Sequence, residues 1–126
     1  MLTYYCPLCW EEIDAESRFC NDCGFNMEEF DQWSYEEKLI ATLSHQIPER
    51  RMIAAEMLGL LKSERAIPAF AHIIENNETD YYFVRNVLIS VAAINHTDSK
   101  HIIERACHNP SKLIEDFAAD ILKTID

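Results

Sequence analysis

Glycine is nearly absent from this chain, with only Gly24 and Gly59 among 126 residues. A phosphate-binding loop needs several closely spaced glycines, so nucleotide-binding motifs of that kind are excluded. So few glycines also argue against folds rich in strands and loops. No apolar run approaches the roughly 20 residues that a membrane-spanning helix needs. The first residues lack the basic and apolar regions of a secretory signal, so we expect a cytoplasmic protein without a membrane role.

Basic residues are scarce as well. Eleven Lys and Arg residues stand against 22 Asp and Glu residues, which gives a formal net charge of −11. The imbalance is strongest in residues 1–33, which contain eight acidic side chains and Arg18 as the sole base. Phosphate backbones are bound by basic surfaces, so this charge disfavours nucleic acid as a partner. We interpret the acidic residues as a solvated surface, with docking to a basic partner as the alternative.

Catalytic signatures are also missing. The five histidines form no His-x3-His or Glu-x-x-His pair, so we expect most of them at the surface or at helix ends. Cys107 stands beside His108, but adjacent residues on a helix point about 100° apart. Because Cys107 is in phase with Ile102, Ile103 and Ala106, we predict a core residue rather than a nucleophile. We therefore expect no enzymatic activity.

Cysteine, by contrast, is concentrated near the N-terminus. Cys6 and Cys9 form one Cys-x-x-Cys pair, Cys20 and Cys23 form another, and ten residues separate the pairs. Two residues between ligands let the chain turn back, so four thiolates can surround one zinc ion tetrahedrally. Such a closed shell leaves no position for water or substrate, so we predict one structural Zn²⁺ per chain. Iron in the same geometry and two disulfides stay open as alternatives.

The residues around these cysteines match a known pattern. It consists of a Cys-Pro-x-Cys-Gly turn, an acidic spacer and a Phe-Cys-x-x-Cys-Gly turn, found here as residues 6–9 and 19–24. In this respect the chain resembles the short zinc-ribbon modules of bacterial and archaeal proteins, which implies metal binding but no single activity. Trp10 stands where the pattern has its first glycine, so this turn must differ or carry strain. Residues 1–33 are too few to fold on burial alone, so the ion would order them.

From Ser34 onward, apolar residues recur at helical spacing. We predict six helices over residues 34–126 and no convincing strand there. The predicted start signals, each a capping residue or a first-turn proline, are Ser34, Pro48, Ser63, Asp80, Asp98 and Asn109-Pro110. Ser34 is followed by Glu37 at the spacing of a capping box.

The helices also repeat. Residues 51–58 align with residues 85–92 at an offset of 34, and residues 115–122 align 30 further on, a period typical of α-solenoids. The repeated pattern contains an arginine, small and apolar residues ending in Leu-Gly, and an Ile-Pro pair. The matching residues are Arg51, Ala54, Ala55, Leu58, Gly59, Ile67 and Pro68. This pattern resembles HEAT repeats, especially the short type also found in phycobilin lyases.

Two details of the repeat lead to structural expectations. Gly59 lacks a Cβ atom, so we expect it to let a neighbouring helix approach closely. Arg85 and Glu115 occupy equivalent positions in successive units, which suggests an ion pair between those units.

The sequence therefore predicts an all-α protein. An α-solenoid of HEAT-like helix pairs, residues 34–126, would follow a small N-terminal zinc ribbon, residues 1–33. Aromatic rings near the boundary are expected to pack the ribbon against the first helix: Tyr4, Tyr5, Trp10, Phe30 and Trp33.

HEAT arrays usually bind proteins, so the resemblance implies a non-catalytic adaptor with a protein partner. The far end of the array, at Ile121, Leu122 and Ile125, has no obvious cap, which leaves room for a homodimer. One alternative is a lyase-related or chaperone-like protein acting on a tetrapyrrole-bearing partner, which would need Cys107 to be accessible and reactive. The other is a nucleic-acid-binding ribbon, which the acidity disfavours.

Overall fold

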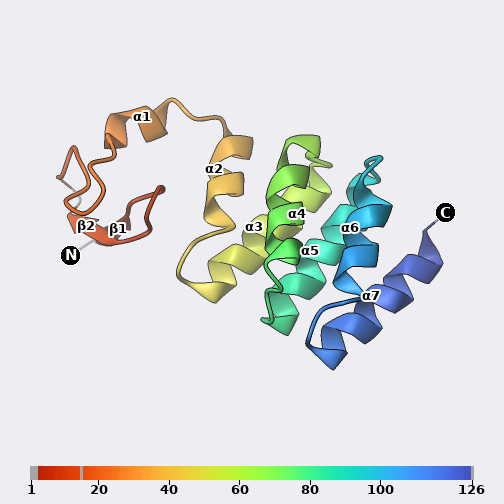
Figure 1. Cartoon of the computed structure of the whole chain (residues 1–126). Helices are drawn as coiled ribbons and strands as arrows, with labels where there is room; N and C mark the ends of the chain where they lie inside the picture. Colours follow the sequence, from red (N-terminus) through yellow and green to blue (C-terminus); the bar gives the residue numbers. More distant parts are fainter. Residues whose placement is uncertain (1–2, 15, 126) are drawn as a thin grey trace.

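The computed structural model describes residues 3–14 and 16–125, and in this part the chain is mainly α-helical (Figure 1). The elements are β1 (Thr3–Tyr5), β2 (Glu12–Asp14), α1 (Met27–Asp31), α2 (Tyr35–Thr42), α3 (Pro48–Leu60), the 3₁₀ helix η1 (Glu64–Ala66), α4 (Ile67–Glu75), α5 (Tyr81–Ile94), α6 (Ser99–Ala106) and α7 (Lys112–Thr124). The expected helical fold class is confirmed, while the solenoid stays a prediction. None of these helices combines the length and the apolar character needed to cross a bilayer.

The N-terminal elements form two loops that each carry a pair of cysteines. Strands β1 and β2 pair antiparallel, with Tyr5 opposite Glu12, and the turn between them contains the first cysteine pair. A bridge between Phe19 and Asn26 closes the second loop. The side chain of Asn26 then accepts the N–H of Glu28 at 3.0 Å at the start of α1, a short helix that was not predicted from the sequence.

Several predicted helix starts are present. The Ser34 hydroxyl accepts the N–H of Glu37 at 3.1 Å, and the Glu37 carboxylate accepts the N–H of Ser34 at 3.2 Å, so the capping box is formed. Pro48 lies in the first turn of α3, and the Asp80 carboxylate accepts the N–H of Phe83 at the start of α5. Asp98 occupies the N-cap position of α6, although its side chain makes no capping bond.

The other two predicted starts are only partly right. Ser63 is the N-cap residue of η1, which leads directly into α4, but its side chain makes no capping bond, and Asn109 lies two residues before the N-cap of α7. The hydroxyl of Ser63 donates to the Glu36 carboxylate at 2.7 Å, and the chain passes through η1 before α4 begins. The buried amide of Asn109 donates to the Glu78 carbonyl at 3.0 Å. Its oxygen accepts the N–H of Ser111, which is the actual N-cap residue of α7.

The longer helices form two rows around one hydrophobic core. Helix α3 packs against α5 and α5 against α7, while α4 lies beside α6 and both contact α5 (Figure 1). Hydrophobic residues from α2 to α7 meet in a single buried cluster. Its largest fully buried side chains are Phe70, Leu58, Ile74, Leu88, Ile103 and Ile114. The cysteine loops lie at one end of this array and α7 at the other.

The predicted close approach at Gly59 occurs between α3 and α5. A Cβ atom on Gly59 would lie 2.9 Å from Ser90 Cα and 2.7 Å from Ser90 Cβ. The two helices are also joined by hydrogen bonds from Ser90 Oγ to the Ala55 carbonyl, at 2.6 Å, and from Asn86 Nδ2 to the Met52 carbonyl, at 3.3 Å. Glycine is therefore required here by the backbone of the neighbouring helix.

Replacing Gly59 by valine should destabilise the protein. Overpacking costs about 1–3 kcal/mol, which exceeds the gain in helix propensity of less than about 1 kcal/mol. We expect the free energy of unfolding, measured in urea, to fall by about 2 kcal/mol. Leu60→Val is the matched control, because it introduces the same side chain at the next position, which is 71% exposed, and should change stability by less than about 0.5 kcal/mol. Equal stabilities of the two variants would contradict the close packing.

The predicted ion pair between Arg85 and Glu115 is wrong. The Arg85 guanidinium lies over the ring of Phe117, with its Cζ atom 5.8 Å from the ring centroid. The Glu115 carboxylate instead lies 3.4 Å from Lys112 Nζ on its own helix. A local pair three residues apart needs no reach across the helix interface, which explains why it forms instead.

Candidate metal centre

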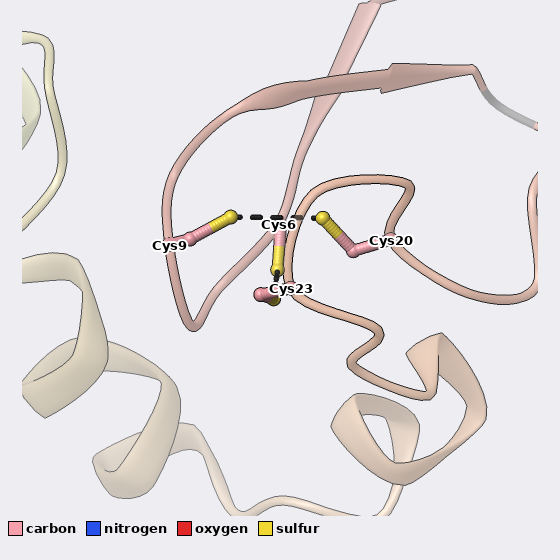
Figure 2. Close-up of side chains that lie close together, drawn as sticks. All are labelled: Cys6, Cys9, Cys20 and Cys23. Atoms are coloured by element: carbon pink, nitrogen blue, oxygen red, sulfur yellow. Dashed lines mark hydrogen bonds between the residues drawn. The ribbon is translucent and has the colours of Figure 1, made fainter.

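The four N-terminal cysteines converge at one point (Figure 2). Their sulfur atoms all lie within 4.8 Å of one another. Cys6 Sγ lies 3.6 Å from Cys23 Sγ, and Cys9 Sγ lies 3.6 Å from Cys20 Sγ, so each close pair joins the two loops. A disulfide bond is about 2.05 Å long, so neither pair is bonded, and all four cysteines are free.

These sulfur–sulfur distances fit a metal ion bound by four thiolates. Zinc–sulfur bonds of about 2.3 Å in a tetrahedron place the sulfurs about 3.8 Å apart. The 3.6 Å pairs and the 4.8 Å limit for the whole group span that value. Four thiolates arranged tetrahedrally are typical of zinc and of iron–sulfur sites. Four sulfurs would complete the coordination, which is the arrangement of a structural ion.

The first loop is a tight turn closed by backbone hydrogen bonds. The N–H of Trp10 donates to the Cys6 carbonyl at 2.7 Å, and the N–H of Cys6 donates to the Glu11 carbonyl at 3.0 Å. Trp10 has a φ of 62°, in the left-handed region that bulky residues rarely adopt. The turn of this loop is therefore built on a strained residue.

The second loop repeats the same turn. Here the N–H of Gly24 donates to the Cys20 carbonyl at 2.9 Å, and the N–H of Cys20 donates to the Phe25 carbonyl at 2.9 Å. Gly24 has a φ of 79°, which glycine adopts without steric strain because it has no Cβ atom. Trp10 thus takes the conformation of the glycine that it replaces. The sequence predicted either a different turn or a strained backbone at Trp10. The structure keeps the same turn, so the backbone of Trp10 is strained.

Backbone N–H groups and neighbouring thiols shape the acidity of the cluster. The N–H of Cys23, followed by that of Asp22, lowers the pKa of Cys20 to about 7 against the opposing effect of burial. The N–H of Glu11 also lowers the pKa of Cys9, but burial and the other three thiols outweigh it and raise the pKa to about 12. A cation among the sulfurs would favour the thiolates, because metal ligands bind deprotonated. N–H groups directed at sulfur are also the outer contacts that orient metal-bound thiolates.

The turn between α2 and α3 contacts the first cysteine loop. Trp10 Nε1 donates to Ser44 Oγ at 3.0 Å, and Gln46 Nε2 donates to the Trp10 carbonyl at 2.8 Å. The ring of His45 lies 4.4 Å from the ring of Trp10 and 4.9 Å from that of Tyr5, measured between centroids. His45 follows the end of α2, as expected for most of the histidines, but it is only 3% exposed and is therefore buried in this contact.

A second set of rings joins α1 to α2. Trp33 lies 5.7 Å from Phe25 and 5.3 Å from Phe30, and Lys38 Nζ lies 4.8 Å from the centroid of Phe30. The predicted aromatic joint therefore includes Tyr5, Trp10, Phe30 and Trp33. Tyr4 is 46% exposed and lies on the surface of the hairpin instead.

A hollow of about 450 Å³ lies between the β1–β2 hairpin and α1. Its apolar lining comes from Tyr4, Tyr5, Ile13, Met27 and Phe30, and its acidic lining from Asp14, Glu16, Glu28 and Asp31. Arg18, the one base among the described residues that line it, lies 3.0 Å from the carboxylate of Glu28. The acidic composition was evident in the sequence, but the hollow that gathers these side chains depends on the fold.

Cys107 does not resemble a reactive thiol. It is half-buried, packs against the helical core, and its sulfur donates to the Ile103 carbonyl at 3.5 Å. Burial, followed by the charges of Glu104 and Glu115, raises the pKa of Cys107. A nucleophilic or attachment cysteine needs an accessible thiol with a lowered pKa. The geometry at Cys107 therefore gives no support to a lyase-like role.

Comparisons of the chain with protein-family models, with curated proteins and with solved structures found no match. The resemblance to zinc ribbons therefore depends on the cysteine spacing and on the geometry of the four sulfurs. The resemblance to HEAT repeats depends on the sequence pattern alone and stays a prediction.

Proposed function

We propose that the protein is a non-catalytic interaction adaptor with a structural zinc ribbon in residues 1–33. Cys6, Cys9, Cys20 and Cys23 would hold one Zn²⁺, and residues 34–126 would form the HEAT-like array. The convergence of the four sulfurs within 4.8 Å supports the metal site. When bound, the ion supplies structural order and no catalysis, because the thiolates leave no open coordination position.

The chemistry of the hollow supports a basic protein segment as the partner. Aromatic rings and carboxylates lie together in it, and both attract a lysine or arginine side chain. Arg18 is already paired with Glu28 and four carboxylates line the hollow, so its described surface is strongly negative. A nucleic acid is not proposed, because the same carboxylates would repel its phosphates. The hollow between the hairpin and α1 is the observation that carries the adaptor proposal.

A labelled peptide of alternating lysine and serine tests the partner chemistry. We expect it to bind the metal-loaded protein in fluorescence anisotropy, with an affinity that falls as salt rises. The double variant Asp14→Asn with Asp31→Asn should weaken binding about ten-fold, because it removes two carboxylates from the hollow. Glu49→Gln with Glu56→Gln is the matched control, since it removes two exposed charges from α3 and should weaken binding less than about two-fold.

Comparing the two double variants shows whether the peptide binds at the hollow or is attracted only by the net charge of the protein. Equal losses in the two double variants would show that only the net charge attracts the peptide, which contradicts a site at the hollow. An absence of binding even at low salt would contradict a basic partner. Neither outcome bears on the metal site, which metal analysis tests separately.

A further inference from the structure

Trp10 is held in its strained conformation from two sides. Within the first loop, its N–H donates to the carbonyl of Cys6, and it directly follows Cys9 in the chain. Strained backbone persists only where the surroundings hold it, and it is common at functional positions. The loop itself would be relieved by glycine, as Gly24 shows in the matching turn. The reason for a tryptophan must therefore lie outside the loop.

That reason is the contact with the turn between α2 and α3. Every part of Trp10 that leaves the loop meets this turn: the indole N–H reaches Ser44, the carbonyl accepts from Gln46, and the ring lies against His45. Glycine could keep only the bond at the carbonyl. Trp10 thus makes the hydrogen bonds that connect the cysteine loop to this turn, and the ring of Tyr5 adds a second contact with His45.

His45 in turn forms hydrogen bonds with residues of the helical array. Its Nδ1 accepts the N–H of Ile47, the N-cap residue of α3, at 3.0 Å. Its carbonyl accepts Arg51 Nη1 at 2.7 Å, and Arg51 Nη2 lies 3.7 Å from the carboxylate of Asp80, which caps α5. A continuous set of contacts therefore runs from the cysteine loop to the starts of two helices.

We propose that Trp10 couples metal binding by the four cysteines to the order of the α2–α3 turn. The metal-bound loop keeps Trp10 in the left-handed conformation that places its ring on His45. Without the ion the loop is free to relax, and the turn loses these contacts. Coupling is reciprocal, so the contacts to Ser44, His45 and Gln46 also strengthen metal binding. This inference depends on the proposed metal site and goes beyond the adaptor role.

Hydrogen exchange of the full-length protein, with and without a metal chelator, tests the coupling. In the unaltered protein, chelation should speed exchange of residues 43–51 about ten-fold while α6 and α7 change by less than about two-fold. In Trp10→Gly, the loop should still bind one metal, because glycine suits the turn. In this variant the amides of residues 43–51 should exchange, with metal bound, as fast as those of the chelated unaltered protein. Chelation should then raise their exchange rate by less than about two-fold.

Two further variants complete the test. Leu8→Ala is the matched control, because Leu8 lies in the same loop and is 62% exposed, and it should respond to chelation as the unaltered protein does. Ser44→Ala with Gln46→Ala changes only the helical side and should weaken metal affinity about three-fold or more in a chelator competition.

Different results would overturn different proposals. A Trp10→Gly protein that keeps its metal and exchanges like the unaltered protein would overturn the coupling alone. So would an unchanged metal affinity after Ser44→Ala with Gln46→Ala. An unaltered protein that binds no metal would overturn the proposed metal site, and the coupling with it.

Discussion

Replacing Cys20 by serine should empty the metal site and unfold the N-terminal loops. Among the described residues, the buried cluster of these loops contains only Cys6, Ile13 and Cys20, which is too little apolar surface to hold the chain. Structural zinc contributes roughly 10–16 kcal/mol of apparent binding free energy in small modules at neutral pH. Elemental analysis should find about one zinc per chain in the unaltered protein and close to none in Cys20→Ser. Circular dichroism should keep most of its helical signal, because the helices have their own core.

Cys107→Ser is the matched control for this experiment. It makes the same chemical change at a half-buried cysteine outside the cluster, so it should keep the full metal content. A Cys20→Ser protein that retained its metal would contradict the four-sulfur site. A red protein containing iron would keep the site and change the identity of the ion.

The sequence predicted the cysteine cluster well because its determinants are local. Two residues between ligands impose a turn, and two such turns can meet without knowledge of the remaining fold. The contacts of Trp10, by contrast, could not be predicted from local sequence. The sequence showed that glycine was missing at that position, but the contacts with Ser44 and His45 come from residues more than 30 positions away. The burial of His45 was missed for the same reason, since nothing near it in the chain predicts the contact with Trp10.

The helices show the same division between local and distant determinants. Ser34 and Asp80 cap helices as predicted, because each finds its partner three residues further on. Ser63 and Asn109 carry equally good local signals, but the Ser63 hydroxyl donates to Glu36. The Asn109 oxygen accepts the N–H of Ser111 only two residues on, while its amide donates to Glu78. Neither side chain accepts an N–H three residues further on, so neither marks the first residue of α4 or α7.

The repeat was informative where it concerned packing between neighbouring helices. The offset of 34 residues matches the hydrogen bond from Asn86 to the Met52 carbonyl, which joins α5 to α3. The ion pair that the repeat predicted between Arg85 and Glu115 does not form, because long charged side chains can pair with several partners of similar energy. Small residues such as Gly59 are fixed by the distance between backbones, so their role followed from the sequence more directly.

Replacing Phe70 by alanine should cost the helical array about 3–5 kcal/mol of stability. Phe70 lies on α4 with no exposed surface, and it belongs to the one core cluster of the helices. Removing its ring loses the burial of a large side chain and leaves a cavity that closely packed neighbours fill only in part. The loss should appear as a lower midpoint of urea unfolding followed by circular dichroism at a helical wavelength.

Tyr82→Ala is the matched control, because it removes an aromatic ring of similar size from α5 at a position that is 63% exposed. It should change stability by less than about 0.5 kcal/mol. A loss at Phe70 no larger than that at Tyr82 would contradict the packing of α4 into the core.

The effect of Phe70→Ala should also spread through the helices rather than stay in α4. The core cluster is continuous from Leu39 on α2 to Ala118 on α7, so opening it anywhere exposes surface shared by both ends. A loss of about 3 kcal/mol corresponds to an increase of more than about 100-fold in the exchange of the slowest amides. We expect that increase in α2 and α7 alike. Faster exchange confined to α4 would instead show that each helix pair opens alone, as weakly coupled repeats do.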